Sequence, residues 1–321
     1  MITYVIRRIL LIIPTVLIVS MIVFLSVRLI PGDVIDMMMA LMGPEATSGL
    51  GLDREAIEQM LGLDVSIPIQ YGRWMGDIIL RGNLGESLRG GPNVTDQLFS
   101  RLPVTIELGV LAVIVGLLIA LPIGIYSAIR QDTLGDYGGR TVGILFLCIP
   151  NFWLGTIVMI YPSIWWGWSP PMELVKFADD PLGNLGMFTI PAVILGASMA
   201  GVTMRMTRTT MLEVLRQDYV RTAWSKGLKE RVVIMRHTLK NAFIPVITIV
   251  GMQLPLLVAG AVIMEQIFGL PGVGRLFLGA LIERDYTMVS GINLFIATVI
   301  IGINLLVDLT YGYLDPRVQN R

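Results

Sequence analysis

The polar side chains that could carry chemistry in this chain lie within or beside long apolar runs. A carboxylate or amide in such a place is a candidate for moving ions or solute, because a polar group in lipid is costly unless it is paired or used. Most of these residues fall near the ends of the runs, where water is within reach. We therefore expect most of them to form hydrogen bonds between helices, each contributing about 0.6 kcal/mol, and keep all six as candidate pathway or gating residues. They are Glu107, Asn151, Glu265, Gln266, Asn304 and Asp308.

The sequence contains none of the short motifs that bind nucleotide or catalyse hydrolysis. It has no G-x-x-x-x-G-K-[ST] phosphate loop, no H-E-x-x-H pair and no G-x-S-x-G turn. The only histidine, His237, has no cysteine or carboxylate pair at ligand spacing, and the only cysteine, Cys148, has no partner for a disulfide within the chain. We expect no enzyme activity, no cofactor and no metal in this chain, so any ATP must be used by another protein.

A second kind of site is indicated by the polar segment from Arg205 to Lys240, which carries nine lysines and arginines between two apolar runs. Apolar and small residues recur in its middle at three- and four-residue intervals, so they share one face of a helix. Trp224 and Leu228 provide apolar surface, while Ala223 and Gly227 would let another protein approach closely. The segment predicts a helix that docks a soluble partner, and its candidate contact residues are Asp218, Val220, Ala223, Trp224, Gly227 and Leu228.

The composition places these residues in an integral membrane protein. Hydrophobic residues make up 54% of the chain and charged residues 15%, with a mean hydropathy of +0.73, whereas soluble domains have roughly 25% charged residues. The zero net charge gives no reason to expect a nucleic-acid partner. Six apolar runs are long enough to cross a bilayer, although the fourth is short and contains Pro191, Gly196 and Gly201. They span residues 9–30, 105–129, 141–166, 188–204, 243–268 and 288–313.

The distribution of basic residues predicts the orientation of these spans. With six spans, the two termini, the loop at 130–140 and the loop at 205–240 lie on one side, and they hold fifteen of the twenty-four lysines and arginines. Short loops rich in lysine and arginine face the cytoplasm. We expect a multi-pass protein of the cytoplasmic membrane with both termini in the cytoplasm.

The chain divides into three parts on this pattern. Residues 1–30 form an N-terminal span, residues 31–101 an extracytoplasmic segment, and residues 102–321 a core of five spans that includes the cytoplasmic loop at 205–243. The middle segment is too long to be structureless. We predict short helices in it at 54–61, with Asp53 as the N-cap and Gly62 after its end, and at 69–80.

The cytoplasmic loop resembles the coupling-loop signature of the permease subunits of ABC importers, in its dipeptide and oligopeptide version. Ala223 and Gly227 keep the spacing of that motif, but Arg221 and Thr222 replace its usual glutamate and alanine, so the acidic contact to the ATPase is not carried over. The resemblance covers nearly the whole chain, and it is to the first of the two permease subunits that such importers contain. The other segments that carry the resemblance are Arg28 to Asp33, Gly82 to Ser87, Arg101 to Leu108, Pro150 to Gly155, Glu265 to Leu276 and Leu314 to Arg317.

The resemblance implies an all-α protein with the type I importer permease fold and six transmembrane helices. It further implies a second homologous permease, two cytoplasmic ABC ATPases that bind ATP and magnesium, and an extracytoplasmic solute-binding protein. On this basis we expect the chain to transport a dipeptide, an oligopeptide or a related small molecule, coupled to the ATPases through residues 218–228.

Two other functions remain open on the sequence. An ion-coupled secondary transporter of a small metabolite would need carboxylates near the midplane, and Asp308, about one turn from the cytoplasmic end of the sixth span, is the best candidate for that role. A membrane scaffold would recruit a cytoplasmic protein through Trp224 without transporting anything.

Overall fold

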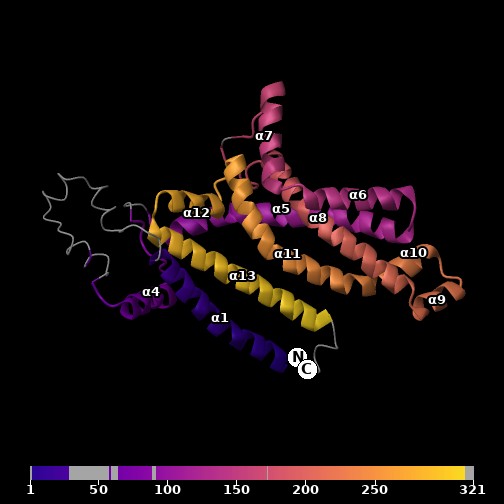
Figure 1. Ribbon diagram of the computed structural model, residues 1–321, viewed down its shortest axis with the longest axis horizontal. Coiled ribbons are helices and arrows are strands. Elements are labelled where there is room, and N and C mark those ends of the chain that lie inside the picture. Colours follow the sequence, from indigo (N-terminus) through magenta and orange to yellow (C-terminus); the bar gives the residue numbers. More distant parts are fainter. Residues whose placement is uncertain (1, 29–57, 59–63, 89–91, 172, 315–321) are drawn as a thin grey trace. The chain divides into compact units, whose positions relative to one another are not determined.

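The computed structural model describes residues 2–28, 58, 64–88, 92–171 and 173–314. Within these residues the chain is almost entirely helical, and its β-structure is a single bridge between Glu86 and Asn93. The elements, shown in Figure 1, are α1 (Ile2–Arg28), α4 (Ile67–Arg81), α5 (Val94–Ile129), α6 (Leu134–Cys148), α7 (Asn151–Trp166), α8 (Pro181–Leu215), α9 (Asp218–Ser225), α10 (Glu230–Val232), the π-helix η1 (Val233–Thr238), α11 (Leu239–Phe268), α12 (Val273–Ile282) and α13 (Tyr286–Leu314).

Among the described residues, five segments are long and apolar enough to cross a membrane: α1, α5, α8, α10 to α11, and α13. The third predicted span, 141–166, is not one straight helix, because α6 and α7 meet at an angle of 90°. The break lies at Ile149 and Pro150, which are both in extended conformation. A residue before proline is disfavoured in the helical region, which explains why α6 ends there. Six spans are therefore present only if the bent pair counts as one.

The fourth predicted span is longer and more buried than its sequence indicated. α8 runs for 35 residues. In its most apolar stretch of 18 residues, 61% is buried, which is the largest share among the five spans. Its glycines allow this packing. A side chain at Gly196 would lie 2.6 Å from the Ala112 carbonyl of α5, and one at Gly201 would lie 2.8 Å from the Gly143 carbonyl of α6.

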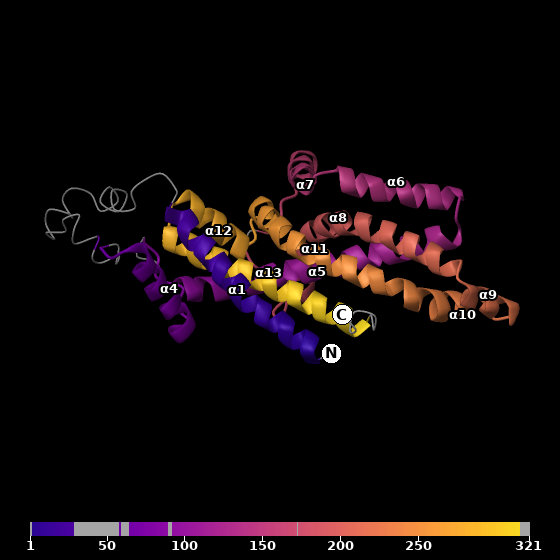
Figure 2. The same ribbon diagram turned by 60° about the horizontal axis from the view of Figure 1, so that its bottom comes forward.

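The chain separates into two compact units, of which the first comprises residues 1–7, 103–275 and 302–321. Its core is apolar and lies between α5, α8 and α11, with Leu108, Phe188, Leu195 and Met264 fully buried. α8 and α11 pack along each other, and α9 and α10 lie at their far ends in both views (Figures 1 and 2). Figure 2 also shows α6 alongside α8. This unit contains the predicted coupling loop.

The second unit comprises residues 8–102 and 276–301. Within it, Tyr71 and Trp74 of α4 pack on Phe24 of α1, and the Ser20 and Tyr71 hydroxyl oxygens are 2.8 Å apart. The turn after α4 packs on the start of α13, where the Ser87 hydroxyl donates to Asp285 at 2.5 Å. These contacts hold α4 and the turn after it within the second unit.

The segment that we predict to be extracytoplasmic differs in part from its predicted outline. The helix predicted at 69–80 is confirmed as α4, which is longer by two residues at its start and one at its end. The helix predicted at 54–61, apart from the helical residue Glu58, lies outside the described residues. The predicted boundary at 101 falls inside α5, and residues 276–301 group with this segment instead of with the rest of the predicted core.

Candidate functional site

The predicted docking helix is present as α9, although it is shorter than the pattern indicated. It begins at Asp218, whose carboxylate lies in the first turn, where negative charge interacts favourably with the helix dipole. It ends at Ser225, and Gly227 then turns the chain with a positive φ of 72°. Gly227 and Leu228 therefore follow the helix and do not continue its face. Gly227 lies four residues after Ala223 because the helix ends between them. A glycine is favoured at such an end, since it adopts a positive φ without strain.

One face of α9 is buried within the chain itself. Val220 is 0% exposed and Ala223 is 5% exposed, and both pack on Val233 of η1, with Val214 and Leu215 of α8 alongside. Val220 and Ala223 therefore face the chain's own loop, and their contact with a partner stays a prediction. The physical reason is that α9 is short and must bury its apolar stripe on the nearest apolar surface, which is its own loop.

The outer face of α9 and the turn after it carry large exposed side chains. Trp224 is 44% exposed and Leu228 is 37% exposed, and Arg221 and Lys226 next to them are also exposed. The ion pair from Arg221 to Asp218, at 3.5 Å, joins two side chains that are mostly in solvent and contributes little. The surface offered outward is an aromatic and an aliphatic side chain surrounded by positive charge, which is the kind of patch that anchors protein interfaces.

α9 is also fastened to α11. The Asn241 side-chain amide in the first turn of α11 donates to the Tyr219 hydroxyl at 2.8 Å. Between them lies η1, a π-helix in which the buried Thr238 hydroxyl donates to the Val233 carbonyl at 3.2 Å. π-Helical turns are rare and are frequent at functional sites. A force on α9 would therefore act on both α8 and α11.

Glu265, one of the candidate pathway residues, has a different environment. It is 0% exposed and lies where α11 turns into α12. Its carboxylate accepts from the Thr105 hydroxyl at 2.6 Å and from the Arg275 backbone N–H at 3.0 Å. The Thr105 hydroxyl oxygen in turn accepts from the Val273 N–H at 2.9 Å. A carboxylate at the first turn of α12 satisfies free amide groups and interacts favourably with the helix dipole. Glu265 thus organises the turn.

The turn around Glu265 also explains the glycines of this segment. Gly269 leaves α11 with a φ of 69°. A side chain at Gly272 would lie 2.2 to 2.4 Å from the Glu265 carboxyl group, and one at Gly274 would lie 2.5 Å from the Val262 backbone. The segment from Glu265 to Leu276 is therefore a close-packed turn between two helices.

The remaining five candidates are spread over separate helices. Glu107 is half-buried on α5, Asn151 is half-buried at the start of α7, and Asp308 is half-buried near the end of α13. Gln266 is exposed although its neighbour Glu265 is buried, and Asn304 is exposed as well. Adjacent positions on a helix point about 100° apart, which accounts for the first pair. Their role in a pathway stays a prediction.

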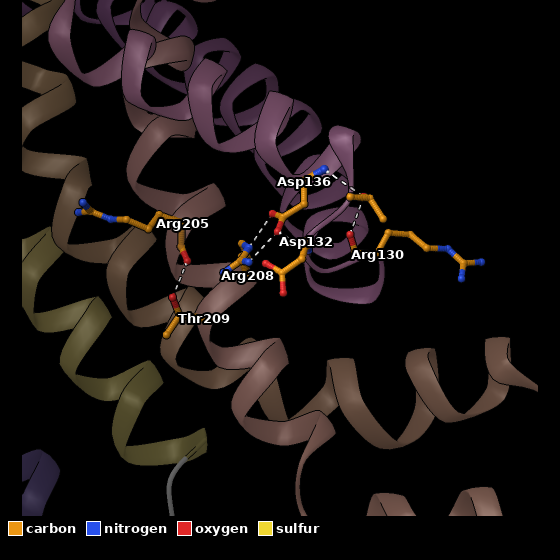
Figure 3. Close-up of polar contacts among 7 residues, drawn as sticks. Arg130, Asp132, Asp136, Arg205, Arg208 and Thr209 are labelled. Carbon is orange, nitrogen blue, oxygen red and sulfur yellow. Dashed lines mark hydrogen bonds and ion pairs between the residues drawn. The ribbon is translucent and has the colours of Figure 1, made fainter.

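A buried ion pair between α6 and α8 was missed from the sequence (Figure 3). The Arg208 guanidinium donates to both carboxylate oxygens of Asp136, at 2.8 and 2.7 Å, and Asp136 is fully buried. The Asp132 N–H donates to the same carboxylate at 3.1 Å, and the Thr133 hydroxyl oxygen caps α6. Two-point pairing of this kind fixes geometry as well as charge. The sequence did contain a signal for it. Asp136 lies three residues after the threonine that caps α6, and Arg208 lies near the end of the apolar helix α8.

Two family models together cover almost all of the chain. The model described as "Binding-protein-dependent transport system inner membrane component" matches residues 120–320, and the model for the N-terminal part of such membrane components matches residues 1–109. Matches of this extent establish the family to which the architecture belongs.

Whole-length relatives and a solved structure agree with this assignment. The oligopeptide transport system permease protein AppB of Bacillus subtilis is 37% identical over 99% of this chain and 100% of its own length. The dipeptide transport system permease protein DppB of Escherichia coli is 36% identical over 100% of each chain. The crystal structure of an amino acid ABC transporter with histidines shares the fold, with a TM-score of 0.51 and 15% identity over 70% of this chain and 94% of that one. The chain is a multi-pass inner-membrane permease, and it belongs to the family of binding-protein-dependent transport system inner membrane components.

Proposed function

We propose that this chain is one of two membrane subunits of an ATP-driven importer for a peptide-like solute, such as a dipeptide, an oligopeptide or a related small molecule. AppB and DppB are permeases of oligopeptide and dipeptide transport systems, which supports this solute class. The position of α9 is the observation that supports coupling to the ATPases. Its Trp224 side chain is exposed, while its inner face packs on α8 and η1.

The proposed complex contains a second homologous permease, two cytoplasmic ABC ATPases and an extracytoplasmic binding protein. ATP and magnesium bind to the ATPases and not to this chain. Both termini and the loop at 205–243 lie in the cytoplasm, which the excess of basic residues in these segments supports. The segment at 61–87 lies on the opposite side, where the binding protein docks.

The proposed mechanism uses α9 as a rigid element between the ATPase and the spans. Val220 and Ala223 hold it against α8 and η1, and Tyr219 joins it to α11. When the ATPases close on ATP, they displace α9, and its attachments move α8 and α11 together. Coupling of binding sites is reciprocal, so delivery of solute from outside also favours closure of the ATPases.

Reconstitution of the whole complex tests this function. The chain is co-purified with the second permease and the ATPases and placed in vesicles, with the binding protein and a labelled dipeptide on the extracytoplasmic side. We expect accumulation that needs both ATP and the binding protein and that continues when ionophores remove ion gradients. Mass spectrometry of the ligand on the co-purified binding protein identifies the natural solute.

Two outcomes would overturn the proposal. Accumulation that survives ATP depletion but collapses with the ion gradient would identify a secondary transporter. A complex that assembles through Trp224 but accumulates none of the solutes carried by its binding protein would identify a scaffold.

A further inference from the structure

A cavity of about 330 Å³ lies between α6 and α8, beside the Asp136–Arg208 ion pair. Three arginines, Arg140, Arg205 and Arg208, line it, together with apolar side chains from both helices. It lies within the first compact unit and is separate from α9 and from the Glu265 turn. Three guanidinium groups so close together repel one another unless negative charge lies near them.

The chain itself supplies only part of that negative charge. Asp136 pairs with Arg208 and neutralises it. Arg140 and Arg205 form no ion pair with a carboxylate among the described residues, and both side chains are exposed. Figure 3 shows the Arg205 guanidinium turned away from Asp136. Two positive charges at the cavity are therefore available to an anion.

A buried hydroxyl group gives independent evidence for a ligand. Ser127 of α5 lines the cavity, is 1% exposed, and its hydroxyl oxygen has no hydrogen-bond partner within the part of the chain that is described. Buried hydroxyl groups without a partner are uncommon and costly. Gly139 lies directly beside it, since a side chain there would come within 2.7 Å of the Ser127 oxygen. An oxygen-rich group entering the cavity would satisfy this hydroxyl.

The cavity is polar at one end and apolar at the other. On α6, Arg140 precedes Gly143 and Leu147, so the charge is nearer the helix end that we place in the cytoplasm. On α8, which runs the opposite way, Met204 precedes Arg205 and Arg208 in the direction of the cytoplasmic loop. Both helices therefore place arginines at the cytoplasmic end of the cavity and apolar side chains further into the membrane. Inorganic phosphate would leave that apolar part unused.

We propose that this cavity binds an anionic phospholipid of the cytoplasmic leaflet. Its phosphate lies between Arg140 and Arg205 and accepts a hydrogen bond from Ser127, and one acyl chain runs along Gly143 and Leu147. Basic pockets between spans on the cytoplasmic side bind the headgroups of anionic lipids. The bound lipid holds α6 against α8 next to the ion pair that joins them.

Lipid titration of the purified complex, followed by native mass spectrometry, tests the site without measuring transport. The complex in detergent is titrated with phosphatidylglycerol, with phosphatidylcholine and with inorganic phosphate. We expect retention of phosphatidylglycerol over phosphatidylcholine. In an Arg140→Gln, Arg205→Gln double variant we expect a loss of about thirtyfold in affinity, because each arginine near the membrane surface contributes a factor of about five.

A matched double variant, Arg130→Gln with Arg216→Gln, removes two exposed arginines at the same end of the unit that do not line the cavity. It is expected to bind phosphatidylglycerol like the unmodified complex, whereas Ser127→Ala is expected to weaken binding several-fold. If the Arg140 and Arg205 double variant does not assemble, the two single variants decide the question with smaller losses.

The proposal is overturned by any of three results. The cavity variants could bind phosphatidylglycerol as tightly as the control, inorganic phosphate could compete equally well, or a dipeptide could displace the lipid and mark the cavity as part of the solute pathway. Because the readout is lipid retention, a failure here leaves the proposed import function untouched, and a failure of import leaves the lipid site untouched.

Discussion

The turn between α11 and α12 and the short helix α9 both connect longer helices, and both contain residues that the sequence marked as functional. In the turn, Glu265 is fully buried and its carboxylate accepts hydrogen bonds from the Thr105 hydroxyl and the Arg275 backbone N–H. In α9, the chain takes up Val220 and Ala223 but leaves Trp224 at the surface. The comparison teaches that residues marked together by a sequence pattern differ in their surroundings. Some are buried and hold the fold, and others stay at the surface, where we propose that a partner binds.

The largest effect is expected where the turn has no space. Gly272→Val places a side chain 2.2 to 2.4 Å from the Glu265 carboxyl group, which its hydrogen bonds prevent from moving away. We expect destabilisation by more than about 3 kcal/mol and little protein in the membrane fraction, measured by quantitative immunoblotting. Gly279→Ala in α12 has open space around it and serves as the control. Normal amounts of the Gly272 variant would show that the turn is not close-packed.

Removing the exposed tryptophan of α9 should leave the protein folded but inactive. For Trp224→Ala we expect normal membrane levels, about thirtyfold weaker association with the ATPases, as for a central interface residue worth about 2 kcal/mol, and a matching loss of uptake. Co-purification of the ATPases and dipeptide uptake are the measurements. Trp165→Ala removes a tryptophan that is 64% exposed in α7 and should change neither. If Trp224→Ala instead lowers the membrane level, α9 belongs with the structural turn.

A smaller loss is expected when Glu265 keeps its shape but loses its charge. Glu265→Gln keeps one acceptor oxygen and replaces the other by an N–H donor. That donor would face the Thr105 hydroxyl or the Arg275 N–H, which both donate to Glu265. We expect a loss of about 1.5 kcal/mol in stability, measured as a lower melting temperature of the complex, with ATPase association retained. Gln266→Ala, an exposed neighbour, should stay within about 0.5 kcal/mol of the unmodified protein. Full stability with lost transport would return Glu265 to the pathway.

The smallest effect separates two roles of Gly227. Its positive φ of 72° favours glycine, but a side chain there meets nothing within 4 Å. Gly227→Ala should cost about 1 kcal/mol through backbone strain, and Gly227→Asn less, because asparagine tolerates this conformation. If the glycine serves conformation alone, uptake by the asparagine variant exceeds that by the alanine variant. If it gives clearance to the ATPase, the larger asparagine reduces uptake more.

The helices themselves could be predicted largely from hydrophobicity, but the break in the third span could not. Pro122, Pro191 and Pro255 all lie inside continuous helices, whereas Pro150 begins a new one at 90° to the last. Proline removes one hydrogen bond, and neighbouring helices can compensate for it within a membrane protein. Whether a proline ends a helix therefore depends on what packs around it.

The candidate residues were identified by type, but their surroundings were not. The periodic pattern in the loop located α9, yet it could not tell whether the face with Val220 and Ala223 or the side chain of Trp224 would be exposed, because Val233 lies in a different element. Asp136 and Arg208 are 72 positions apart, and nothing in either local sequence indicates the other. Contacts over such separations arise only from the packing of helices.

The sequence by itself determined the membrane class, the number of apolar runs and the position of a basic loop with a short helix, because these depend on composition and on periods of a few residues. The tertiary structure decided which side of that helix is free, assigned Glu265 to a structural turn, and brought three arginines and a buried serine around one cavity. The physical reason is that exposure and electrostatic pairing depend on which helices pack together, and small residues such as Gly196 and Gly201 permit that packing from far along the chain.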